Sequence, residues 1–280
     1  FRAYEKMQYQ ALTELVGSAV VVFLAILALF YNRGLLWVMV AHVIGALASI
    51  ALAALILQKK FFSLRLNANL LKWKCFAREG MYFWLAFIMA LLVYNVDMIM
   101  LFSFRGSVET GIYKAAYSVV RNTEMIPPLF ALALYPALVK LIKKSKTEFV
   151  STYKRSLTLM TIAALALTAT MIIVAGPVIR IVYGKGFLQS VPVLRALSLT
   201  VYFFLVGSLN SYYMYAAGRQ KQSTIFQAIG IALTIILGLL LIPRLGIGGA
   251  VFACVAGLGI NYLLKQTYVI RMNRSLIQHG

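Results

Sequence analysis

The sequence predicts an all-α integral membrane protein with about eight transmembrane helices. Hydrophobic residues make up 62% of its 280 residues, whereas soluble globular domains contain about 45–50%. The mean hydropathy of +0.87 agrees with this excess, and only 12% of the residues carry a charged side chain. These values leave too little polar surface for a water-soluble fold, so we expect the chain to lie in a membrane.

Eight apolar stretches are long enough to cross a bilayer. A hydrocarbon core about 30 Å thick needs roughly 20 helical residues per crossing. The stretches cover 11–30, 35–57, 80–104, 109–139, 152–175, 191–217, 222–242 and 247–270. They are continuously apolar and lack the alternation of a membrane-spanning β-strand. We therefore interpret each of them as a helix.

Segment 58–79 separates the first two predicted helices from the last six. Helical spacing gives this segment one apolar face, which is formed by Phe62, Leu66, Leu70 and Trp73. Basic and polar residues share another face. The segment is either an amphipathic helix on the membrane surface or an ordinary basic loop that fixes the topology. Both interpretations make it a natural boundary.

Proline predicts irregularities in two of the later helices. Pro127 and Pro128 lie in the middle of stretch 109–139, where missing donors and ring clashes should kink the helix. A kink there indicates a cavity or a hinge. Gly176 and Pro177 are expected to end the helix at 152–175.

The charge distribution predicts the orientation of the chain. Lys and Arg number 27 against 7 Asp and Glu, which gives a net charge of +20. Most basic residues fall in the connections on one side of the predicted bundle, and such loops stay in the cytoplasm. We expect both termini of this chain to be cytoplasmic. The basic residues alternate with apolar runs and form no solvated face, which argues against nucleic acid as a partner.

The sequence carries no recognisable catalytic or cofactor motif. Its two cysteines and two histidines lack the spacing of metal ligands, and it has no Gly-x-x-x-x-Gly-Lys-Ser/Thr phosphate loop. A membrane enzyme would need a sizeable outer loop or paired carboxylates near the interface, and neither is present. We predict a protein that is not an enzyme and holds no metal or cofactor.

Ionisable side chains in the third and fourth predicted helices form the candidate site. A charged residue costs about 2.5–3.5 kcal/mol at a helix centre and is usually paired or functional. In stretch 109–139, helical spacing places on one face Lys114, Tyr117, Arg121, Glu124 and Pro128. We do not expect this face to contact lipid.

Two roles follow for these charges. Asp97 and Lys114 are predicted to lie at similar depth in antiparallel neighbours, where they can pair, although such a pair can also merely fix the helix register. Arg121 lies deeper, and its planar guanidinium suits the phosphate oxygens of an anionic head group. The predicted substrate-binding residues are Arg121, Lys114, Asn122 and Tyr117, and those for ion coupling or pairing are Asp97 and Glu124.

Short motifs along the whole chain carry a family resemblance. In order they are Tyr94-Asn-Val-Asp97, Gly111-Ile-Tyr113-Lys-Ala-Ala-Tyr117, Tyr135-Pro136-Ala137-Leu138, Ile181-Val-Tyr183-Gly184 and Ile242-Pro243-Arg-Leu-Gly246. Together they resemble the Wzx-type O-antigen and exopolysaccharide flippases of the multidrug/oligosaccharidyl-lipid/polysaccharide (MOP) exporter superfamily. The opening residues 1–7 are similar to the entry of that family's fifth helix.

The resemblance implies a division of the chain. Residues 1–57 would be the last two helices of a first lobe, 58–79 a cytoplasmic linker, 80–270 a complete six-helix second lobe, and 271–280 a cytoplasmic tail. On this interpretation the first four helices of the family are missing, so we expect a truncated chain. The family's cavity lies between its lobes, and this chain would carry only part of it.

The resemblance also implies a function. Members move an undecaprenyl-diphosphate-linked oligosaccharide across the bacterial cytoplasmic membrane by alternating access, for surface polysaccharide biosynthesis. The implied partners are this lipid-linked oligosaccharide, the phospholipid membrane and polysaccharide polymerase machinery. Two alternatives stay open, a cation-coupled multidrug antiporter of the same superfamily and a nontransporting membrane scaffold.

Overall fold

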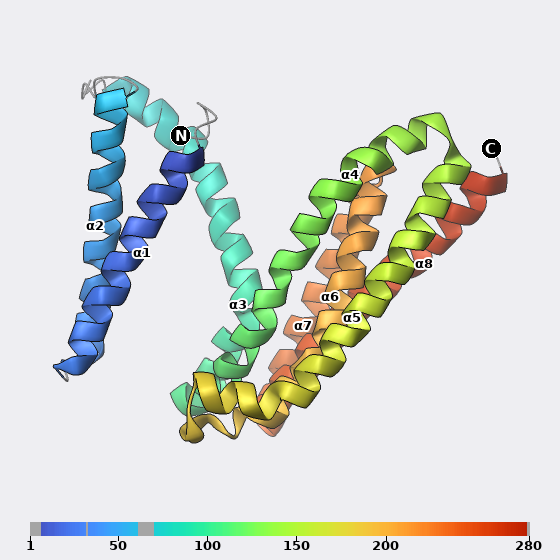
Figure 1. The fold of residues 1–280 in the computed structure, drawn as a ribbon. Helices are drawn as coiled ribbons and strands as arrows, with labels where there is room; N and C mark the ends of the chain where they lie inside the picture. The colour runs from blue at the N-terminus through green and yellow to red at the C-terminus, as the bar shows by residue number, and fades with distance from the viewer. Residues whose placement is uncertain (1–6, 32, 61–69, 279–280) are drawn as a thin grey trace. The chain divides into compact units, whose positions relative to one another are not determined.

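The computed structural model describes the backbone of residues 7–31, 33–60 and 70–278, and their side chains except those of 7, 35, 70–94, 131–133 and 277–278. Within these ranges the regular structure is entirely helical. Figure 1 shows the elements α1 (Met7–Phe30), α2 (Leu35–Lys60), α3 (Leu70–Arg121), η2 (Asn122–Met125), α4 (Ile126–Lys144), α5 (Lys146–Val182), η3 (Lys185–Phe187), α6 (Ser190–Ala216), α7 (Gln220–Leu245) and α8 (Ile247–Gln278).

The helices are long and apolar enough for a multi-pass membrane protein. Six of them, α1, α2, α5, α6, α7 and α8, meet the length and hydropathy of a membrane span, and segments 95–130 and 134–144 together would make a seventh. Large apolar side chains such as Leu29 and Phe23 are more than 60% exposed, which is expected of surfaces that face lipid. The predicted all-α membrane fold is confirmed.

A single glycine separates the third and fourth predicted helices. Residues 70–121 are helical throughout except at Gly106, whose φ of 80° and ψ of −170° break the helix. Such a positive φ favours glycine, which has no Cβ to clash. Figure 1 shows that the chain reverses its direction in this region. The predicted connection 105–108 is therefore reduced to one residue.

Proline shapes the two neighbouring helices in different ways. The predicted kink at Pro127 and Pro128 takes the form of the 3-10 turn η2, after which the prolines occupy the first turn of α4, where their missing donors are tolerated. The predicted end of the fifth helix at Gly176 and Pro177 is wrong. Helix α5 runs through Pro177 to Val182, because one lost hydrogen bond does not outweigh the packing of its buried face.

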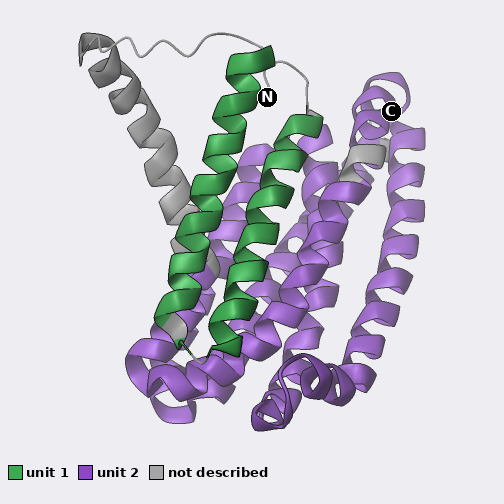
Figure 2. Cartoon of the chain, turned by 60° about the vertical axis from the view of Figure 1, so that its left-hand side comes forward, with its two compact units in different colours: residues 1–81 green, residues 82–280 purple. Residues whose placement is uncertain are grey.

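The chain divides into two compact units, residues 1–81 and 82–280, which are coloured separately in Figure 2. In the first unit α1 and α2 pack closely where small residues face each other. A Cβ on Gly45 would lie 2.8 Å from the carbonyl oxygen of Gly17, so only glycine allows this approach. Ser49 Oγ donates to the Thr13 carbonyl at 2.9 Å and ties the two helices together.

Helix α6 is the centre of the second unit. It contacts α4, α5 and α8, while α7 packs along α8. Of the six candidate spans, α6 has the lowest mean hydropathy, 1.6, and the largest buried share, 56%. Its inward face joins aromatic side chains from α5, and Tyr213 stacks between Phe149 and Tyr153 with centroid distances of 4.3 and 4.1 Å.

The predicted amphipathic face of segment 58–79 lies outside what the structure describes, because it excludes residues 61–69 and the side chains of 70–94. The assignment of 1–57 and 80–270 to two lobes, of 58–79 to a linker and of 271–280 to a tail stays a prediction.

Candidate functional site

A cavity of about 390 Å³ lies inside the second unit. Its walls come from α3, η2, the start of α4, α6, α7 and α8. The volume falls within the range of about 300–1,000 Å³ that is typical of small-molecule sites. Three of the six predicted site residues line it, namely Asp97, Tyr117 and Glu124.

Asp97 is held at one end of the cavity by its neighbours on α3. The side chain is only 5% exposed. The Tyr113 hydroxyl donates to its Oδ2 at 2.5 Å, and the Met98 backbone N–H donates to its Oδ1 at 2.9 Å. Tyr113 is fully buried and stacks on Tyr117 with a centroid distance of 5.8 Å. This carboxyl group is therefore fixed rather than solvated.

The predicted pair of Asp97 and Lys114 is wrong, because Tyr113 takes the place expected for the lysine. Successive residues of a helix point about 100° apart, so the inward position of Tyr113 turns Lys114 away. Lys114 is exposed and does not line the cavity. Helical spacing identified the correct turn of the helix but not the residue on it that faces inward.

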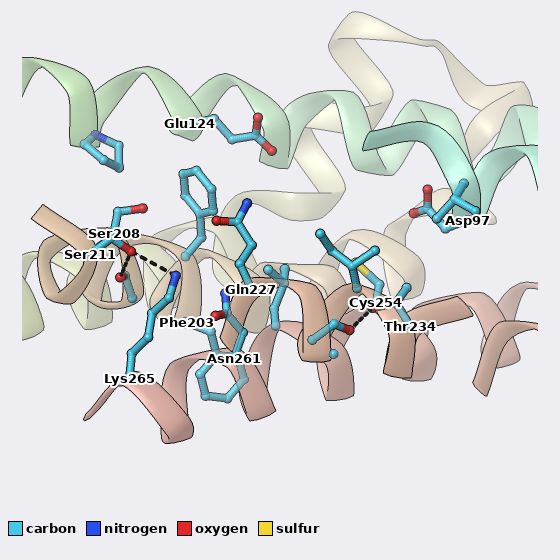
Figure 3. A pocket seen from close by; sticks show the side chains of 18 of the residues that line it. Asp97, Glu124, Phe203, Ser208, Ser211, Gln227, Thr234, Cys254, Asn261 and Lys265 are labelled. Atoms are coloured by element: carbon cyan, nitrogen blue, oxygen red, sulfur yellow. Dashed lines mark hydrogen bonds between the residues drawn. The ribbon is translucent and has the colours of Figure 1, made fainter. Parts of the chain in front are cut away.

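Arg121 and Asn122 are also exposed, and neither lines the cavity. Arg121 nevertheless lies close enough to Glu124 for their charges to attract each other. Glu124 is half-buried and lies in η2. Figure 3 shows Glu124 on the wall opposite Asn261 and Lys265. The 3-10 turn before the two prolines thus carries a carboxylate to the edge of the cavity.

Lys265 of α8 is a site residue that the sequence analysis missed. Its side chain is only 3% exposed and lines the cavity. Its Nζ donates to Ser211 Oγ at 2.9 Å, and Ser211 in turn donates to the Gly207 carbonyl at 3.0 Å. The sequence analysis treated the basic residues mainly as signals of chain orientation and did not single out Lys265. Its place inside the predicted helix 247–270 was the signal that could have identified it.

One turn before Lys265, Asn261 brings an amide into the same cavity. Its Oδ1 is buried and has no hydrogen-bond partner among the described residues. Gln227 of α7 and Ser208 of α6 line the cavity beside it. Figure 3 shows Lys265 and Ser211 toward one end, Asp97 toward the other, and Gln227 and Asn261 between them.

The donor set does not suit a metal ion. Among the described residues, no group of three or more His, Cys, Asp or Glu side chains could hold one. Cys254 lines the cavity as a buried free thiol. The arrangement instead offers one cation, two separated carboxylates and several neutral polar groups within an apolar wall.

Aromatic side chains cover much of the wall between these polar groups. Phe203 and Phe204 of α6 line the cavity together with Tyr212 and Tyr215 near the end of that helix. Phe203 packs against Tyr262 of α8, with ring centroids 5.7 Å apart. Aromatic faces beside polar groups suit ligands that present both apolar and polar surfaces.

Comparison with known proteins finds a matching family, a curated relative and two solved structures with a similar fold. The model of a family described as polysaccharide biosynthesis protein matches residues 1–142. An uncharacterized membrane protein of Methanocaldococcus jannaschii is 26% identical over 227 residues, which are 79% of this chain and 42% of that protein. The chain therefore spans less than half the length of this curated relative.

Two solved structures share the fold. The lipid II flippase MurJ in an inward closed conformation superposes with a TM-score of 0.72 at 18% identity, over 95% of this chain and 58% of that one. A multidrug resistance MATE family transporter of the MOP superfamily, in an outward-facing conformation, gives a TM-score of 0.59 at 16% identity, over 95% and 62%.

Proposed function

This chain belongs to the polysaccharide biosynthesis protein family, and from that premise we propose that the protein moves a lipid-linked oligosaccharide across a membrane by alternating access. The observation that carries the proposal is the cavity within a multi-pass helical unit, whose ionisable lining residues include Lys265 on α8, a helix long and apolar enough to cross a membrane. Charges in membrane helices are expensive and typically mark a substrate or ion pathway.

The likeness in fold to a flippase and to a transporter supports this class of function. Both of those proteins are described by their conformations, inward closed and outward-facing. Alternating access requires such a pair of states, in which the site opens to one side at a time. The two neighbours show a similar fold in an inward closed and an outward-facing conformation. We propose that this protein alternates between two such states.

Charge complementarity supports the oligosaccharide diphosphate as the substrate. In the proposed site Arg121, Lys114, Asn122 and Tyr117 contact the diphosphate head group, since guanidinium and ammonium groups bind phosphate oxygens strongly. Arg121 and Lys114 are exposed on the second unit and are thus accessible to a large substrate. The family resemblance implies that such a substrate binds between the two lobes of a complete family member.

Asp97 and Glu124 are the proposed coupling groups. Both are carboxylates of the cavity wall, and Asp97 is almost completely buried. Binding of a cation or proton at such a group removes a charge that is costly to bury, and this change can bias one state of the cycle over the other. The bacterial cytoplasmic membrane, cytoplasmic termini and contact with polymerase machinery belong to the same proposal.

A multidrug antiporter is the second candidate, because the cavity also combines carboxylates with aromatic side chains. Besides Asp97 and Glu124, the wall carries Tyr117, Phe203, Phe204, Tyr212 and Tyr215. Cationic drugs favour aromatic faces and negative charge. Lys265 in the same wall opposes a cationic ligand by charge repulsion.

The test is complementation of a flippase-deficient bacterium by the intact protein and by Arg121→Ala and Arg121→Lys, with equal membrane levels. We expect the parent to restore surface glycan and Arg121→Ala to lose it, while Arg121→Lys retains part. Drug resistance without glycan rescue would favour the antiporter. A nontransporting scaffold predicts that charge reversal in Arg121→Glu changes neither readout.

A further inference from the structure

Lys265 carries a buried charge that the described residues do not neutralise. Its one hydrogen bond in that part of the chain goes to the Ser211 hydroxyl at 2.9 Å, although an ammonium group has three donors. Asp97 and Glu124 line the same cavity, but neither forms an ion pair with Lys265 among the described side chains. A buried ammonium without a counter-charge is strongly unfavourable, and an anionic ligand would remove this penalty.

The Ser211 hydroxyl orients the lysine toward the cavity. It accepts from Lys265 Nζ and donates to the Gly207 carbonyl one turn earlier in α6. Its single proton is therefore used, and the hydroxyl presents a lone pair to the ammonium group. The remaining two Lys265 donors are left for a ligand.

Asn261 provides a second, independent observation at the same place. It precedes Lys265 by one helical turn, so the two side chains share a face of α8. Its buried Oδ1 has no partner within the described residues, and a buried polar atom without a partner is rare in folded proteins. The amide therefore offers an acceptor to a hydroxyl or N–H donor that lies beside the anion.

We infer that this end of the cavity binds a glycosyl phosphate unit, with the phosphate at Lys265 and hydroxyl groups of one sugar at Asn261 and Gln227. The inference rests on the proposed function and names the part of the substrate that enters the cavity, one sugar with its phosphate, while Arg121 and Lys114 outside the cavity are left for the other phosphate of the diphosphate. A cavity of about 390 Å³ accepts a ligand of small-molecule size. The rest of an oligosaccharide lies outside it.

The two ends of the cavity give this ligand a defined orientation. Asp97 repels a phosphate at its end, whereas its carboxylate oxygens, and those of Glu124 on the wall that faces Asn261, accept hydrogen bonds from sugar hydroxyls. Lys265 attracts the phosphate at the opposite end, as Figure 3 shows by the positions of Lys265 and Asp97. The charge pattern therefore selects a molecule that is anionic at one end and neutral and polar at the other.

The direct test is binding of small probes to the intact protein in detergent. Glucose 1-phosphate, N-acetylglucosamine 1-phosphate, inorganic phosphate and glucose are titrated separately, with the thermal unfolding midpoint and calorimetry as readouts. We expect at least one of the sugar phosphates to bind more tightly than inorganic phosphate and glucose. Lys265→Met should weaken sugar phosphate binding by about tenfold or more. A hydrogen bond to a charged group contributes more free energy than a tenfold change in affinity requires.

Three further variants locate the site. Lys265→Arg keeps the charge and should keep most of the affinity. Asn261→Leu should weaken sugar phosphate binding but leave inorganic phosphate binding nearly unchanged. Lys154→Met, which removes an exposed lysine on α5, is the matched control and should bind like the parent. Lys265→Met without ligand should be at least as stable as the parent, because it removes a buried unpaired charge.

The inference is overturned if no phosphate compound binds, if Lys265→Met binds like the parent, or if glucose binds as tightly as both sugar phosphates. Equal binding of inorganic phosphate and the sugar phosphates would refute the sugar contacts. Complementation separates this result from the proposed function. If binding depends on Lys265 but the parent protein does not rescue surface glycan, the binding site is supported and the flippase function is refuted. If Lys265→Met rescues surface glycan fully, the flippase function is supported and the role of Lys265 is refuted.

Discussion

Replacing Gly257 by alanine should separate α7 from α8. A Cβ at this position would lie 2.7 Å from the Gly230 carbonyl oxygen and would also clash with Thr234 Oγ1. A carbon and a carbonyl oxygen normally approach to about 3.3–3.6 Å. The backbones must therefore move apart by roughly 0.6–0.9 Å at this crossing. Because the carbonyl belongs to the backbone, a change of rotamer cannot relieve the clash.

The loss of stability in Gly257→Ala can be estimated by comparison with a second helical glycine that has free space around it. Overpacking of a close contact costs about 1–3 kcal/mol, while glycine to alanine within a helix gains about 1 kcal/mol. Gly111 lies in α3, and a Cβ there would meet no atom within 4 Å. Gly111→Ala therefore receives the helix gain alone. We expect the two variants to differ by about 1–3 kcal/mol, with Gly257→Ala the less stable.

The assay is unfolding of the intact protein in detergent, by heat and by denaturant, with each variant in the same preparation. For Gly257→Ala, the added Thr234→Ala change should restore part of the stability, since it removes the hydroxyl but not the Gly230 carbonyl. A Gly257→Ala protein as stable as Gly111→Ala would refute the close packing of α7 on α8. Full restoration by Thr234→Ala would show that the side chain, not the backbone, limits the approach.

Two other changes test contacts in the two units. Tyr113→Phe removes the hydroxyl that donates to Asp97 and should reduce stability by about 1–3 kcal/mol, measured by unfolding in detergent. The added Asp97→Leu change should recover most of that loss, and no recovery would contradict a shared hydrogen bond. Gly17→Leu places a side chain against Ser49 and the Gly45 carbonyl. It should loosen α1 from α2 and speed proteolysis of the first unit, whereas Val22→Leu, at a position 56% exposed, should not.

Long apolar runs predicted the helices well because a bilayer imposes a minimum length on every crossing. The runs at 222–242 and 247–270 correspond to α7 and α8, which meet at Gly246, a residue with a positive φ of 57°. The predicted stretches 80–104 and 109–139 bracket Gly106, but the length of the connection was harder to predict, since neighbouring residues remain helical on both sides. Only the backbone angles of that one glycine mark the reversal.

The site was predicted less well, because the helical spacing of side chains shows which residues share a face but not which face is buried. The face that begins at Lys114 shares the correct turns with the cavity wall, yet Tyr113 holds Asp97, and of that face Tyr117, Glu124 and Pro128 line the cavity while Lys114 and Arg121 do not. Partners from α6 and α8 are distant in sequence, as with Ser211 and Lys265. Their contact depends on packing between helices that no local pattern encodes.

The composition of α6 has a consequence for how the protein is made. This helix is the least apolar of the six candidate spans, with a mean hydropathy of 1.6, and the most enclosed by its neighbours. A nascent segment enters the bilayer from the translocon according to its own hydrophobicity. Helix α6 is thus the weakest insertion signal of the six, and its integration should rely on α5 and α8, with which it packs. A truncated protein that ends before α8 should therefore integrate α6 less efficiently and be degraded faster than the parent.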